Sequence, residues 1–253
     1  MAILNDLSLT TWQFALVLLA AVLVGMARSG MAAISLLATP LLVYIYGGKG
    51  AIALVLLLML VGDVFAVKEY RRHTLWTEIK SLLPSVIIGL LVGSIVGTAI
   101  NDRQFVILVA IIILVSLGAI IFLNRKGAGA VIPHNRYFIV FTGLLSGFAS
   151  MVGNASGPIF AVYLMAIGLK KQNYLGTSAW LFFIMNLIKL PIHVFAWYTI
   201  DIRLALLAVI LIPAVYAGIR VGVAIIKVLH EKVFYYVLVS MTAISAIRLL
   251  ISF

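Results

Sequence analysis

Two short breaks in an otherwise apolar sequence carry residue types that bind small anions. The first, Arg28-Ser29-Gly30, joins a guanidinium to a glycine turn, and the second, Gly153-Asn154-Ala155-Ser156-Gly157, adds amide and hydroxyl groups. A helix that begins after a break presents unpaired N–H groups, which favour an anion. The candidate substrate-binding residues at the breaks are Arg28, Ser29, Gly30, Gly153, Asn154, Ser156 and Gly157. The alternatives are a cytoplasmic anchor for Arg28 and ordinary helix capping for Asn154 and Ser156.

Ionisable residues inside apolar segments are costly and are therefore further candidates. Lys189 follows Asn186 by three residues, so both lie on one helical face and could bind substrate, although Lys189 could instead extend to the membrane surface. Asp63 ends an apolar segment within reach of Lys68, where it could carry a coupling proton or form a structural pair with a basic residue. His193 could relay protons or simply satisfy a kinked helix.

These residues must be positioned by membrane helices, because the composition excludes a soluble domain. The chain has 253 residues, of which 65% are hydrophobic and 10% are charged, against roughly 25% charged in a soluble domain. The absence of cysteine excludes thiolate metal sites, and we expect no metal and no cofactor. The net charge of +11 is best explained by basic cytoplasmic loops, so no nucleic-acid partner is expected.

Ten apolar segments divide the chain. The second and seventh are short, so each is either half of a re-entrant hairpin or a short tilted span. We therefore expect an all-α polytopic membrane protein with eight to ten membrane segments. The segments cover residues 9–27, 31–46, 50–67, 78–100, 104–123, 136–152, 156–168, 173–197, 202–226 and 232–252.

The two halves of the chain, residues 1–126 and 127–253, carry similar patterns. Pro40-Leu41-Leu42-Val43-Tyr44 recurs loosely as Pro158-Ile159-Phe160-Ala161-Val162-Tyr163, and Gly93-x-x-x-Gly97 recurs as Gly218-x-x-x-Gly222. The loops after odd-numbered segments hold 12 Lys and Arg and the opposite loops hold 3, which places the odd loops in the cytoplasm and both termini outside. The second repeat then starts on the side opposite the first. Inverted repeats are typical of secondary transporters, whose sites lie near broken helices.

The glycine patterns resemble those of the TauE/SafE family. Gly25-Met26-Ala27-Arg28-Ser29-Gly30, followed by Thr39-Pro40-Leu41-Leu42, is similar to the first-repeat signature, and Gly143-Leu144-Leu145-Ser146-Gly147 with Gly153 to Pro158 is similar to the second. The resemblance covers nearly the whole chain and adds Thr39 to the candidate substrate-binding residues. It implies a bacterial inner-membrane permease for small anions, often sulfite, sulfonates or related organic acids. Ala32-Ala33 replaces expected glycines, which affects the choice of substrate more than the fold.

The function expected is therefore a secondary transporter that moves a small anion across the inner membrane by alternating access. The chain has no P-loop, so it is not expected to hydrolyse ATP by that route or to be an enzyme. An anion channel is the main alternative, and an intramembrane serine hydrolase using Ser156 and His193 is a second. The expected partners are the anion and the lipid bilayer. Proton coupling and a homodimer stay open.

Overall fold

The structure, a computed structural model, describes residues 10–99 and 135–230 and a few positions beyond, and all regular elements in these ranges are helical. The expected segment 104–123 lies outside the described residues, and so does nearly all of segment 232–252. The elements are α2 (Thr11–Arg28), η1 (Ala32–Ile34), α3 (Ser35–Tyr70), η2 (Arg71–His73), α4 (Trp76–Ala99), α6 (Arg136–Gly153), α7 (Ser156–Ala166), α8 (Lys171–Pro191), η3 (Ile192–Ala196), α9 (Ile202–Ile210) and α10 (Ile212–Val228).

Local sequence signals set several of these helix boundaries. Thr10 and Gln13 form a reciprocal capping box at the start of α2, and the side chains of Asn135 and Asp201 accept backbone N–H groups at the starts of α6 and α9. The expected segments 31–46 and 50–67 lie in one continuous element, α3, which is interrupted at Gly47, where φ is 70°. Glycine tolerates this left-handed conformation at no steric cost, so it marks the division between the two segments.

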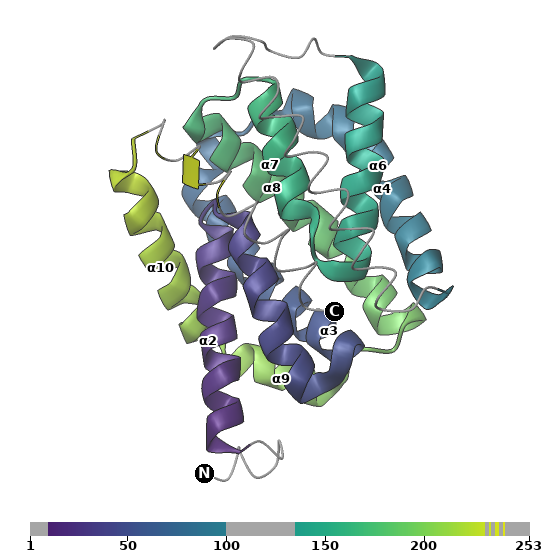
Figure 1. Ribbon diagram of the computed structural model, residues 1–253, viewed down its shortest axis with the longest axis vertical. Helices are drawn as coiled ribbons and strands as arrows, with labels where there is room; N and C mark the ends of the chain where they lie inside the picture. The colour runs from purple at the N-terminus through teal and green to yellow at the C-terminus, as the bar shows by residue number, and fades with distance from the viewer. Residues whose placement is uncertain (1–9, 100–134, 231–232, 234–235, 238–239, 241–253) are drawn as a thin grey trace.

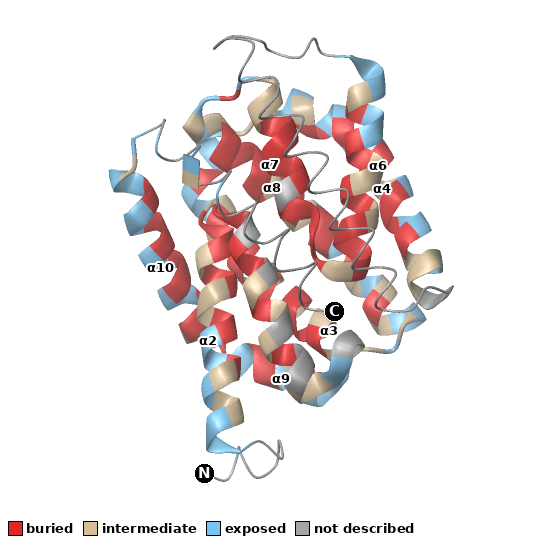
Figure 2. Ribbon diagram, in the orientation of Figure 1, coloured by how far each residue is buried: buried red, intermediate tan, exposed pale blue. Residues whose placement is uncertain are grey.

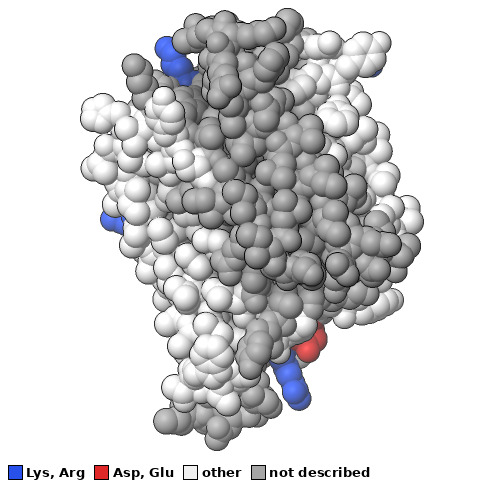
Figure 3. Space-filling view, viewed as in Figure 1, with Lys and Arg blue, Asp and Glu red and all other residues white. Residues whose placement is uncertain are grey.

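Five of the described helices are long and apolar enough to cross a membrane, and α9 with α10, bent by 47°, makes a sixth if the pair counts as one span. The protein is therefore a multi-pass membrane protein. The described residues visible in Figure 3 agree with this, because Lys, Arg, Asp and Glu appear among them in only a few places. Helix α7 has 11 residues, or about 16 Å, which is roughly half of the ~30 Å hydrocarbon core.

The described helices pack around a central pair. Helix α3 packs on α8, α10 packs on α2, and α4 packs on α6. In Figure 1, α2 and α10 rise together on one side, while α4 and α6 descend together on the other. The buried residues of Figure 2 gather on the faces that these helices turn toward one another. The candidate residues of α3 and α8 thus lie on the central pair.

Glycines bring the helices of each outer pair into close contact. A methyl group at Gly218 of α10 would lie 2.2 Å from the carbonyl oxygen of Val22 in α2, and one at Gly25 would lie 2.1 Å from that of Val215. The α4–α6 crossing is built in the same way, because methyl groups at Gly89 and Gly147 would each lie 2.1 Å from a backbone oxygen, of Leu144 and Val86 respectively. No side chain fits at such distances, so both crossings require glycine.

We expect Gly218→Ala to destabilise the protein by about 1–3 kcal/mol, because the added methyl group must push α10 away from α2. The measurement is the unfolding temperature of the purified protein in detergent. Val221→Ala, on the exposed face of the same helix, is the control and is expected to leave that temperature unchanged. An unaltered unfolding temperature in Gly218→Ala would contradict the close crossing.

Candidate functional site

The second break forms because Asn154 ends α6 in the left-handed conformation, with φ of 53°. Asparagine is one of the few residues other than glycine that adopts this conformation readily. The Asn154 side chain does not cap α7, so the capping interpretation is wrong for this residue: its Nδ2 donates to the carbonyl oxygen of Ile52, 3.3 Å away. Gly153 is the last residue of α6, and Ser156, which is buried, is the first residue of α7.

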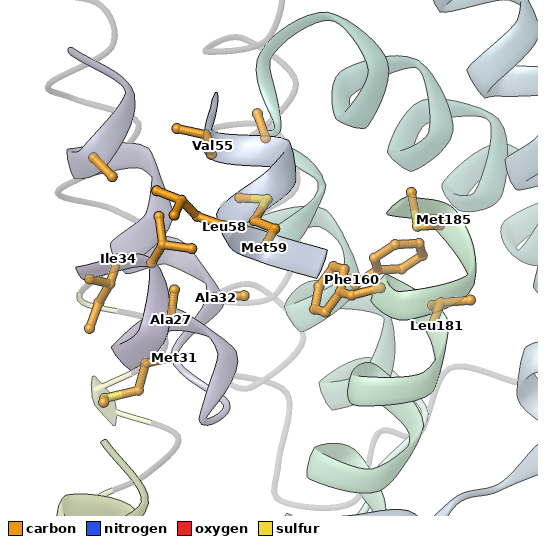
Figure 4. Close-up of a cluster of buried hydrophobic side chains, with 14 of the residues drawn as sticks. Ala27, Met31, Ala32, Ile34, Val55, Leu58, Met59, Phe160, Leu181 and Met185 are labelled. Atoms are coloured by element: carbon orange, nitrogen blue, oxygen red, sulfur yellow. The ribbon is translucent and has the colours of Figure 1, made fainter. Parts of the chain in front are cut away.

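The first break contains two residues that end α2. Ser29 is its C-cap, and its Oγ donates to the carbonyl oxygen of Met26 at 2.7 Å. Gly30 has φ of 126°, a conformation that favours glycine. The two breaks touch, because a methyl group at Gly157 would lie 2.8 Å from Cβ of Ala32. Figure 4 shows Ala32 and Phe160 in the apolar cluster beside them.

Arg28 and Asp63 form a buried ion pair between α2 and α3. Arg28 Nη1 donates to Asp63 Oδ1 at 3.2 Å, and Asn186 Nδ2 of α8 donates to the other carboxylate oxygen at 2.7 Å. The Arg28 guanidinium also lies over the ring of Phe182, 4.9 Å from its centroid. Arg28 is therefore not a surface anchor. Asp63 has the basic partner that one interpretation required, but the partner is Arg28 and not Lys68.

Lys189 joins α8 to the second break. Its side chain is completely buried, which excludes extension to the membrane surface, and its Nζ donates to Asn154 Oδ1 and to Ser150 Oγ, the latter at 3.4 Å. Lys189 and Asn186 face the same side of α8, as their spacing predicts. The hydrogen bonds thus form two groups, which Asn186 and Lys189 bring together on one face of α8. We call the six residues of the two groups the polar cluster: Arg28, Asp63 and Asn186 in one, and Ser150, Asn154 and Lys189 in the other.

The polar cluster contains two basic side chains and one carboxylate. Arg28, Asp63 and Lys189 are the buried charged residues among those that the structure describes. The carboxylate pairs with Arg28, whereas both hydrogen-bond acceptors of Lys189 are neutral. Burying a charge with only neutral hydrogen-bond acceptors is expensive, so this arrangement favours the arrival of an anion.

The remaining candidates lie outside these hydrogen bonds. His193 lies in the π-helical turn η3, with its Nδ1 2.8 Å from Thr199 Oγ1 and its buried Nε2 without a partner. The ring of His193 therefore bonds to Thr199 and not to Ser156, so the pairing that a hydrolase would require is not formed. Thr39 lies in the first part of α3, and its buried Oγ1 has no partner.

Sequence reasoning missed two residues of this region, Ser150 and Phe182. Ser150 precedes Asn154 by four residues and thus shares its helical face, as does Ser146, so the spacing was a usable signal. Phe182 precedes Asn186 by four residues on α8, but nothing in the sequence distinguishes it from the many other apolar residues of that helix.

Interrupted helices around buried polar groups are typical of helical membrane transporters. The family model of the sulfite exporter TauE/SafE matches residues 13–249, nearly the whole chain. The chain belongs to this family, which is one of membrane transporters and not of enzymes. Comparison with curated proteins and with solved structures gives no match.

Proposed function

We propose that this protein is a secondary transporter that carries a small anion across the bacterial inner membrane by alternating access. Sulfite, a sulfonate or a related organic acid is the proposed cargo, in keeping with the family. One observation carries the proposal: a buried polar cluster with more basic than acidic groups lies where two helix breaks meet. An oxyanion that leaves water needs charge compensation and N–H donors, and the cluster offers both.

In this proposal each polar residue has a separate task. Arg28 and Lys189 compensate the charge of the anion, while Asn186 and Asn154 orient it through their amide groups. The N–H groups at the start of α7, from Ser156 and Gly157, add donors aligned with the helix dipole. Thr39, Ser29, Gly30 and Gly153 are proposed to shape the path next to the breaks.

Alternating access is favoured over an open channel because the polar cluster is shut off from solvent in this conformation. Arg28 is 8% exposed, and Asp63 and Lys189 are 0% exposed. An anion can reach them only if helices separate on one side. The short α7 and the segment of α3 before Gly47 are the parts whose ends adjoin the cluster, so we propose that they move.

The proposed architecture is a pair of inverted repeats, residues 1–126 and 127–253. The spacing of the residues at the glycine crossings supports it. The contact residues of α6 follow those of α2 by 122 positions: Leu144 follows Val22, and Gly147 follows Gly25. The contact residues of α10 follow those of α4 by 129 positions: Val215 follows Val86, and Gly218 follows Gly89. Thus the α2–α10 crossing matches the α6–α4 crossing residue by residue. This register pairs Gly89-x-x-x-Gly93 with Gly218-x-x-x-Gly222, one helical turn away from the alignment expected from the sequence.

The direction of the helices supports the inversion. Lys227 near the end of α10 pairs with Glu69 near the end of α3, at 2.9 Å, and α4 begins a few residues after Glu69. The end of α10 therefore lies level with the start of α4, so the two helices run in opposite directions. Both termini are proposed to face away from the cytoplasm. Removing the buried Arg28 from the loop count leaves the excess of basic residues in the odd loops intact.

Proton coupling is part of the proposal through His193, which lies in η3 next to the polar cluster, whereas Asp63 on α3 is held in its ion pair with Arg28. The bilayer surrounds the protein, and a homodimer stays a proposal for the assembly. Transport is tested by reconstituting the purified protein in liposomes and measuring uptake of sulfite, methanesulfonate and short carboxylates under imposed pH and voltage gradients. No uptake of any of these anions would overturn the proposed function.

We expect Asn154→Gly to reduce anion uptake by roughly tenfold or more, because it removes a hydrogen bond to a charged group, worth about 1.5–3 kcal/mol. Glycine is chosen because it tolerates the φ of 53° at this position, where alanine would be strained. The control is Asn135→Gly, at the N-cap of α6, which should leave uptake unchanged. Full uptake in Asn154→Gly would remove this residue from the site.

A further inference from the structure

The carboxylate of Asp63 already occupies donors that suit an oxyanion. It is completely buried, and its two oxygens accept from the Arg28 guanidinium at 3.2 Å and from the Asn186 amide at 2.7 Å. Arg28 uses one terminal nitrogen in this pair, while its Nε is buried without a partner. The bidentate capacity of the guanidinium is therefore not used by Asp63.

The charges of the cluster determine what else can enter. Among the described residues, Arg28 and Lys189 supply two positive charges and Asp63 supplies one negative charge. A singly charged anion would balance this set, since it would meet Lys189 and the unused Nε of Arg28. A doubly charged anion would leave a negative excess next to Asp63 inside the protein, which is costly at short range.

We propose that Asp63 is a specificity-determining residue that acts as a fixed counter-charge and restricts the cargo to anions bearing a single negative charge. This inference rests on the proposed function and narrows its substrate class. Asp63 rejects a dianion by repulsion, and it accepts a monoanion because Arg28 and Lys189 together carry one charge more than it neutralises. Specificity of this kind depends on an unfavourable contact with the wrong ligand as much as on favourable contacts with the right one.

The test compares two tetrahedral probes of similar shape, methanesulfonate with one negative charge and sulfate with two. Their binding to the purified full-length protein is measured by calorimetry and by competition with sulfite uptake in liposomes. We expect wild-type protein to bind methanesulfonate on the order of tenfold more tightly than sulfate. Asp63→Asn should reduce this ratio by about tenfold or reverse it, because the repelling charge is gone.

Asp201→Asn provides the matched control. Asp201 caps α9 through its carboxylate, and asparagine caps helices equally well. The same loss of one carboxylate far from the cluster should leave the preference for methanesulfonate unchanged. An equal change of preference in both variants would overturn the inference, because the net charge of the protein, and not the position of the carboxylate, would then determine which anion is preferred.

A second variant covers the case in which Asp63→Asn does not fold. Ser150→Asp places a carboxylate next to Lys189 and brings the described set to zero net charge, so methanesulfonate binding should fall by at least about tenfold. Unchanged binding in Ser150→Asp would overturn the inference. Wild-type protein that binds sulfate as tightly as methanesulfonate would also overturn the inference. Uptake of a proton by the protein when sulfate binds would overturn it as well, because Asp63 would then not be a fixed charge.

The inference and the proposed function fail in different ways. If wild-type protein transports sulfite but does not discriminate between the probes, or binds neither, the counter-charge role of Asp63 is lost and transport stands. If no anion binds and none is taken up, the proposed function fails and the inference fails with it.

Discussion

Replacement of Lys189 by methionine is expected to reduce anion uptake by on the order of 100-fold or more, corresponding to about 3 kcal/mol. Lys189 is the buried cation whose described acceptors, Asn154 and Ser150, are both neutral. Methionine has a similar length and no charge, so the cluster would hold one positive and one negative charge and offer no excess to an anion. The measurement is sulfite uptake by proteoliposomes at matched protein density.

The same substitution is expected to change stability little. The loss of two hydrogen bonds is offset because a charged group no longer has to be kept out of water, and apolar replacement of buried charges is often neutral or stabilising. Loss of uptake with an unchanged unfolding temperature therefore separates a binding role from a structural one. Lys68→Met, at an exposed lysine of α3, is the control. Normal uptake in Lys189→Met would refute the role assigned to this cation.

Arg28→Met is expected to lower the free energy of unfolding by about 3–5 kcal/mol, because it leaves the Asp63 carboxylate buried with only the Asn186 amide as a described partner. Asp63→Asn should be destabilising for the complementary reason, since it leaves the Arg28 charge uncompensated. The double variant should cost clearly less than the sum of the two single changes, because it removes both charges together. The measurement is denaturant or thermal unfolding in detergent micelles.

The chain contains its own control for this double-mutant cycle. Lys227 and Glu69 form an ion pair of 2.9 Å with exposed side chains, and pairs of that kind contribute about 0–1 kcal/mol. Lys227→Met and Glu69→Gln should therefore be nearly additive and nearly neutral. Strong coupling in the surface pair together with weak coupling between Arg28 and Asp63 would contradict the burial that distinguishes the two pairs.

The helices and their breaks could be predicted from the sequence because hydropathy and glycine act locally. The expected segment 156–168 begins with α7 at Ser156 and extends two residues beyond its end, and segment 136–152 is α6 without its last residue. The expected break at Gly47 lies where φ becomes positive. Membership of the TauE/SafE family, suggested by the glycine patterns, is confirmed over residues 13–249.

The partners inside the polar cluster could not be predicted in the same way. Arg28 and Asp63 are 35 residues apart, and Asp63 and Asn186 are 123 apart. Hydropathy places each residue on a helix, but the rotation of one helix against another depends on packing across the whole molecule. Lys68 was the nearest basic residue along α3 and therefore the natural choice, yet five residues along a helix do not bring two side chains onto one face.

The glycine crossings have a mechanical consequence. Because the backbones of α2 and α10 are in contact, and those of α4 and α6 are too, each pair of helices should move as one rigid unit. We call each of these two helix pairs a strut. Each strut joins a helix from the first half of the chain to one from the second half. The two halves are thus interlocked and cannot swing apart as separate units. Any rocking must take place between the struts, along the seam of α3 and α8 where Asp63 and Asn186 meet.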